Sequence, residues 1–243
     1  MWPDLRTNSR QMIVFISIGD FLVAGSNIIG LYAKQMCNIQ ATINIAAVLS
    51  SFFWTVYLSV YFYLTICKQI SMWSERLAMY LFHITAWGIP LAIAIAAYVE
   101  GAVGSSEDYV SSGWCWIKYT HSGKRWKMVL WMCIAGKGWE ILAYIAITVF
   151  YVLVKFHIRR ELKMGFVPGS HFLTQRSVEV AKRAEYKLTF IPVVFILLRI
   201  WGTIRFFRFL ADYPNNPSAL DWLVILQVST DHCIQWSNLP LYV

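Results

Sequence analysis

The sequence predicts an all-α protein that lies in a membrane, and three observations support this prediction. Hydrophobic residues make up 58% of the 243 residues and charged residues 14%, whereas soluble proteins contain about 45–50% and about 25%. Long windows of the chain carry no charge, although a soluble helix would place charged residues in nearly every turn. The basic residues gather mainly between the apolar segments, as they do in chains oriented in a bilayer.

Six segments approach the length of about 20 apolar residues that a bilayer-spanning helix requires. We place them near residues 11–33, 41–67, 76–98, 127–154, 188–210 and 219–236. The sixth segment begins as LDWLVILQV and then turns polar at Asp231, His232 and Gln235, so we expect it to be short or incomplete. The prediction is a single transmembrane domain with six spans.

The distribution of Lys and Arg predicts how these spans are oriented. The N-terminal end, the turn at 68–76 and the loop at 155–187 together contain 12 basic residues, and the opposite side contains five. Because basic residues are in excess on the cytoplasmic side, we expect loop 155–187 to be cytoplasmic and loop 99–126 to be extracellular. The formal charge of +8 therefore indicates a lipid bilayer as partner and no nucleic acid.

Two of the five cysteines fall on the predicted extracellular face. Cys37 precedes the second span and Cys115 lies in loop 99–126, where an oxidising environment allows a disulfide to persist. We predict a Cys37–Cys115 bridge that ties the loop to the second span; the alternative is a pair of thiols. Trp116 is expected either to lie at the bilayer interface or to cover a ligand. The chain has no CxxC motif or Cys/His cluster, so we predict no metal site and no cofactor.

The motif GKGWE places two charges in the middle of the fourth span. Lys137 and Glu140 are three residues apart and therefore share one face of a helix. At 1.5 Å per residue, Lys137 lies about 16 Å from Trp126, near the middle of the hydrocarbon core. An unpaired charge there costs at least about 2.5–3.5 kcal/mol, so we expect both side chains to face inward and find partners. Gly136 and Gly138 would let a neighbouring helix approach closely.

Three further charged residues lie inside predicted spans. We expect Arg199 to bridge to Glu140, Arg205 to face the extracellular half of the interior, and Asp20 to pair within the bundle. One interpretation is that these charges only hold helices together. The other is that Lys137, Arg199 and Arg205 line a pocket for a polar or acidic ligand, with Glu140 and Trp116 as further ligand-binding candidates.

Short motifs in the third span and the outer loop resemble a known receptor class. The third span contains HITAWGIPLAI, with Trp87 and Pro90 in a WGxP pattern, and the outer loop contains Cys115-Trp116. This combination resembles the secretin and adhesion families of G-protein coupled receptors, in which the tryptophan and proline belong to the fourth of seven helices. The stretches WPDLR, SSFFWTV, GWCWI and IPVVFILLRIW are similar to orphan receptors related to the cyclic-AMP receptor family.

The resemblance implies a heptahelical receptor-type bundle at the cell membrane, of which this chain would hold helices two to six and part of seven. It also implies that an unknown extracellular ligand is sensed and that movement of 127–154 against 188–210 transmits the signal to a heterotrimeric G protein. We assign helix packing or switch roles to Trp87, Pro90, Pro192 and Asp20, because a proline inside a span can kink it.

The basic cytoplasmic loop offers two interpretations. Arg159, Arg160, Lys182 and Arg183 would contact either anionic lipid or the G protein that the resemblance favours. A different class of protein is a membrane transporter, which intramembrane charges also indicate, although inverted repeats are not evident. The five histidines are scattered over different segments, so we predict no catalytic residues and no enzyme.

Overall fold

A computed structural model describes residues 2–32, 34–68, 72–104, 115–118, 125–164, 195–197, 199–208 and 210–211. The predicted span 219–236 lies outside these residues, as do Pro192, Lys182 and Arg183. Residues 195–197, 199–208 and 210–211 are helical and are called the 195–211 segment below.

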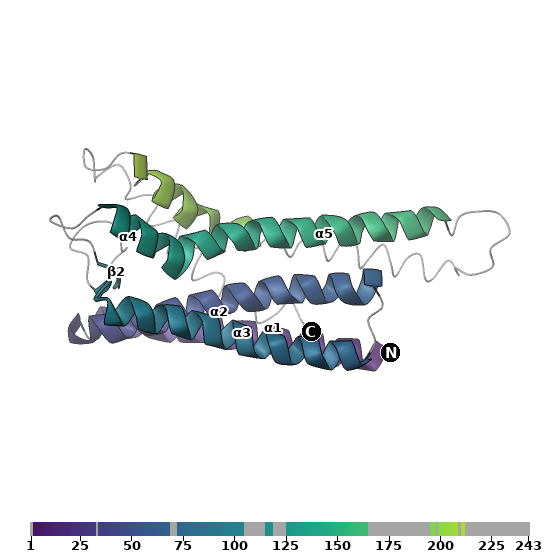
Figure 1. The fold of residues 1–243 in the computed structure, drawn as a ribbon, viewed down its shortest axis with the longest axis horizontal. Coiled ribbons are helices and arrows are strands. Elements are labelled where there is room, and N and C mark those ends of the chain that lie inside the picture. The colour runs from purple at the N-terminus through teal and green to yellow at the C-terminus, as the bar shows by residue number, and fades with distance from the viewer. Residues whose placement is uncertain are drawn as a thin grey trace.

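Long helices that run along one axis make up most of the described chain (Figure 1). Their bounds are α1 Trp2–Tyr32, α2 Cys37–Tyr63, α3 Met72–Val99, α4 Arg125–Met132 and α5 Gly138–Met164. The 3-10 turn η1 (Lys34–Met36) joins α1 to α2, and two π-helical segments interrupt the regular geometry. The π-helix η2 (Leu64–Lys68) continues α2, and η4 (Cys133–Lys137) connects α4 to α5.

Four stretches among the described residues are long and apolar enough to cross a membrane: Asn8–Gly30, Cys37–Cys67, Trp73–Val99 and Arg125–Arg160. Large apolar side chains point outward from them, among them Phe21 at 76% exposed and Tyr80 at 70%. A soluble protein would not leave such a surface to water, so the bilayer is the environment in which this exterior is stable.

The second helix is the centre of the bundle. About 56% of its most apolar window is buried, compared with 17–22% for the other three candidate spans. Trp54, Leu49 and Ala41 are fully enclosed between α1, α3 and α5. Two apolar clusters form the core, one around Ala41 and Ile117 near the disulfide and one around Trp54 and Leu58 toward the other end of α2.

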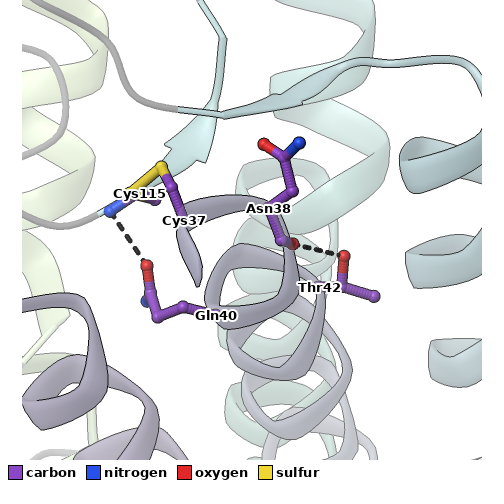
Figure 2. Close-up of a disulfide and its surroundings, with 5 residues drawn as sticks. All are labelled: Cys37, Asn38, Gln40, Thr42 and Cys115. Atoms are coloured by element: carbon purple, nitrogen blue, oxygen red, sulfur yellow. Dashed lines mark hydrogen bonds between the residues drawn. A yellow bond between two sulfur atoms is a disulfide. The ribbon is translucent and has the colours of Figure 1, made fainter. Parts of the chain in front are cut away.

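A disulfide joins the outer loop to the start of α2, as predicted. Cys37 is bonded to Cys115 with 5.4 Å between their Cα atoms (Figure 2). The backbone N–H of Cys115 also donates to Oε1 of the fully buried Gln40 at 3.0 Å. Next to this anchor, strands β1 (Val103–Gly104) and β2 (Trp116–Ile117) pair antiparallel, with Val103 opposite Ile117. Ordered loop residues therefore cover this end of the bundle.

The basic stretch after residue 154 is helical as far as Met164. Figure 1 shows that α5 extends well past the end of α2, on the side away from the disulfide. Arg159 and Arg160 lie exposed on this extension. The first part of the predicted 155–187 loop is thus a continuation of the helix.

Candidate functional site

The two charges of GKGWE form a buried ion pair. Lys137 is the last residue of η4 and Glu140 belongs to the first turn of α5. The Nζ atom of Lys137 lies 2.7 Å from Oε2 of Glu140, and the two side chains are 15% and 7% exposed. The pairing and inward orientation agree with the three-residue spacing of the motif.

The second oxygen of Glu140 connects α5 to the 195–211 segment. Oε1 accepts hydrogen bonds from the hydroxyl of Tyr144 at 2.6 Å and from the hydroxyl of Thr203 at 2.7 Å. The carboxylate is therefore satisfied by three donors from two helices, which offsets the cost of removing its charge from water. These four residues, Lys137, Glu140, Tyr144 and Thr203, are called the Glu140 network below.

The structure corrects the predicted partner of Arg199. Its Nη2 atom lies 3.8 Å from Oδ1 of Asp20 on α1, where Ser51 of α2 also donates a hydrogen bond at 2.8 Å. Gly19 explains this position, because a Cβ there would come within 3.3 Å of Cβ of Ser51. The close approach of α1 to α2 turns Asp20 inward. The predicted Glu140–Arg199 bridge is thus replaced by an Asp20–Arg199 pair, and the expectation that Asp20 pairs within the bundle holds.

Aromatic rings enclose the Arg199 guanidinium. Its central carbon lies 4.6 Å from the ring centroid of Phe52 and 5.5 Å from that of Phe195. Such contacts stabilise a cation modestly when it is removed from water. Arg205, on the same segment, is buried with 9% of its surface exposed.

Trp116 packs against η4 beside Gly136. A Cβ atom built on Gly136 would lie 3.4 Å from Cζ2 of Trp116, so the indole ring packs against η4 one residue before Lys137. The half-buried ring also contacts the apolar core beside the disulfide. Trp116 thus lies against the residue that precedes Lys137 in the chain.

Trp87 and Pro90 both lie in α3 and take part in helix packing. Trp87 meets Phe15 of α1 edge-to-face, with 6.5 Å between ring centroids, in a cluster that contains Trp54 and His83. Pro90 is buried, and the helix continues through it to Val99. Trp87 thus packs, partly buried, against the apolar cluster around Trp54, and Pro90 is buried within α3.

A second polar cluster, which the sequence analysis missed, ties the three helices together near the opposite end. Oε1 of Glu75 accepts hydrogen bonds from Nδ2 of Asn8 at 2.7 Å and from the buried hydroxyl of Tyr61 at 2.6 Å. The three residues come from α3, α1 and α2. Sequence separations of 67 and 14 residues leave no periodic signal for such a contact.

Gly138 is required by the π-helical geometry beside the network. Its N–H donates to the carbonyl oxygen of Cys133, and a Cβ at Gly138 would lie 2.8 Å from that same oxygen. We expect Gly138→Ala to destabilise the protein by about 1–3 kcal/mol, because a backbone oxygen cannot easily move away. Thermal unfolding in detergent measures this as a lower Tm.

Two matched glycines serve as controls for this substitution. A Cβ at Gly88 meets nothing within 4 Å, and one at Gly136 meets Trp116 at 3.4 Å, an ordinary contact. Gly88→Ala and Gly136→Ala should therefore leave the Tm close to that of the unmodified chain. An equal Tm for all three variants would show that Gly138 has no special role.

Comparison with known proteins identifies the class of protein to which this chain belongs. Residues 11–237 match the 7 transmembrane receptor (rhodopsin family), so the chain belongs to this family. It is a multi-pass membrane protein, and the heptahelical receptor-type fold expected from the sequence is confirmed. Membership places the chain among receptors rather than enzymes.

The individual relatives are receptors too. G-protein coupled receptor 157 of Mus musculus is 36% identical over 221 residues, which are 88% of this chain and 66% of that protein. The Homo sapiens protein of the same name is 36% identical over 221 residues, 88% of this chain and 64% of that protein. Cyclic AMP receptor-like protein A of Dictyostelium discoideum is 25% identical over 218 residues, 87% of this chain and 49% of that protein. The chain spans about two thirds of the length of the first two.

Proposed function

We propose that this chain senses an extracellular ligand and transmits the signal to a heterotrimeric G protein by moving the 195–211 segment against α5. The observation that supports this most directly is the 2.7 Å hydrogen bond from Thr203 to Glu140, which joins these two elements inside the membrane. A charged group at this depth must keep its partners. Any change at Glu140 is therefore passed to the segment that carries Thr203.

The ligand side of the proposal begins at Trp116 and Lys137. The ring of Trp116 packs beside η4, and the disulfide at the neighbouring Cys115 holds this part of the loop on α2. An ammonium group has three N–H donors, and Nζ of Lys137 directs one of them to Glu140. A ligand carboxylate or phosphate is the kind of group that would accept hydrogen bonds from the other two donors. Such a group would compete with Glu140 for Lys137 and so loosen the Glu140 network.

The G-protein side of the proposal is the extension of α5. Arg159 and Arg160 are exposed near the C-terminal end of α5 and would contact the G protein together with Lys182 and Arg183. The relatives are named as G-protein coupled receptors. For this chain the coupling is part of the proposal.

The test is G-protein activation by the full chain in cells, measured as dissociation of labelled Gα and Gβγ subunits for each Gα class. We expect a basal signal with at least one class, lowered about tenfold by Arg159→Glu/Arg160→Glu because charge reversal opposes an anionic or polar partner surface. Lys118→Glu, an exposed charge reversal at the disulfide end, is the matched control and should keep the signal. Correctly oriented chain at the cell surface that activates no Gα class would contradict the proposal.

A further inference from the structure

Arg199 is a charged link between the 195–211 segment and the helix pair α1 and α2. Its pair with Asp20 reaches α1, and its guanidinium lies over Phe52 of α2. Two further polar links of the segment run to α4 and α5: Arg125 donates to the carbonyl oxygen of Leu210 at 2.7 Å, and Thr203 donates to Glu140. The segment is thus held on one side by Asp20 and on the other by Glu140.

We propose that Arg199 has two partners, Asp20 in the state described here and Glu140 in the signalling state, and that its transfer between them moves the 195–211 segment. The signalling part of this inference rests on the proposed function, whereas the transfer itself does not. It assigns a second acceptor to Arg199 within the same intramembrane network.

The depth of the pair explains why Arg199 must exchange one acid for another. Asp20 lies 12 residues after Asn8, the first residue of its candidate span, or about 18 Å along the helix. This is near the middle of the hydrocarbon core, where an unpaired guanidinium is strongly disfavoured. Arg199 therefore leaves Asp20 only if a second carboxylate is within reach.

Glu140 is that second carboxylate. Arg199 and Thr203 are four residues apart on one helix and so lie on the same face, about 6 Å apart along the axis. Thr203 already donates to Glu140 at 2.7 Å. The ring of Phe195 lies 5.9 Å from that of Tyr144, which also donates to this carboxylate. The extended arginine side chain spans such a distance with a small shift of the segment.

The present contacts of Arg199 are suited to release. Its 3.8 Å separation from Asp20 is longer than the 2.7–2.9 Å of a strong charge-assisted hydrogen bond. Ser51 donates to Asp20 at 2.8 Å and would remain its donor after Arg199 departs. The rings of Phe52 and Phe195 flank the cation and stabilise it between the two acids. An acidic ligand that draws Lys137 away from Glu140 would leave the Glu140 carboxylate available to Arg199.

The transfer is tested by distance measurements between spin labels on the full chain in lipid nanodiscs. Exposed positions suited to the labels are Phe21 on α1 and Leu197 on the segment, in a background with Cys67, Cys133 and Cys233 replaced by serine. Asp20→Asn should shift the distance distribution toward a separate, longer population and raise the basal G-protein signal about fivefold or more. Ser51→Ala, which keeps all charges but removes the donor left to Asp20 after release, should not produce the longer population.

Three variants make the result specific to this ion pair. The exchange Asp20→Arg/Arg199→Asp should restore the original distance and basal signal. Asp20→Asn/Glu140→Gln should show no longer-distance population, because the second partner is gone. Asn27→Ala removes the 2.5 Å hydrogen bond between Asn27 and Asn44 of the same helix pair and should leave the distance unchanged.

An unchanged distance in Asp20→Asn would overturn the proposal, as would a charge exchange that fails to restore the original distance. A distance shift that the exchange reverses, in a chain that activates no Gα class, would support the transfer of Arg199 and contradict the proposed function instead.

Discussion

Glu140→Gln is expected to cause the largest loss of any single substitution in this chain, reducing both cell-surface expression and basal signalling. The amide leaves Lys137 without a counter-charge near the middle of the membrane, and its single carbonyl oxygen cannot replace the two carboxylate oxygens that accept from Lys137, Tyr144 and Thr203. Breaking a buried ion pair by removing one partner typically costs about 3–5 kcal/mol. Surface immunolabelling and G-protein activation measure the two effects separately.

A charge-neutral double variant separates folding from signalling. Lys137→Gln/Glu140→Gln removes both charges, so no ion is left buried without a partner, and surface expression should return close to that of the unmodified chain. Signalling should stay low, because the Glu140 carboxylate that holds Thr203 is absent. If Glu140→Gln alone left both surface expression and signalling unchanged, the network would have no switching role.

Cys37→Ser should cause the second large effect, a marked drop in thermal stability. The disulfide closes a loop over a sequence separation of 78 residues, and loop-closure entropy for that length corresponds to about 4–5 kcal/mol. The variant also frees the segment that positions Trp116 beside Gly136, so we expect weaker signalling from the chain that remains folded. Thermal unfolding in detergent, with and without reductant, measures the stability.

The controls for this prediction use reductant and a second cysteine. Reductant should lower the Tm of the unmodified chain and leave that of Cys37→Ser unchanged. Cys133→Ser removes a free, half-buried thiol of η4 and should change the Tm little. A Tm of the unmodified chain that does not respond to full reduction would show that the bridge contributes nothing to stability.

Local sequence patterns were sufficient for some parts of the site and insufficient for others. The three-residue spacing of Lys137 and Glu140 predicts their shared face because helical periodicity acts over one turn. Tyr144, four residues after Glu140, carries the same signal and could have been included. Thr203 could not, because 63 residues separate it from Glu140 and only the packing of two helices brings them together.

The partner of Arg199 is the part of the site that sequence patterns could least predict. Charge and depth indicated that it needs an acid, but both Asp20 and Glu140 lie at a suitable depth. The choice depends on the close approach of α1 to α2 at Gly19, which turns Asp20 toward the interior beside Ser51. The sequence contains Gly19, which permits the close approach, but it does not show which helix packs there.

The sequence by itself determined that this chain is a helical membrane protein and that Cys37 and Cys115 form a disulfide. These features follow from the length of the apolar segments and from the charges between them, because each segment inserts into the bilayer according to its own composition. The tertiary structure alone decided which buried acid meets which buried base, because that depends on how closely neighbouring helices approach and at what rotation.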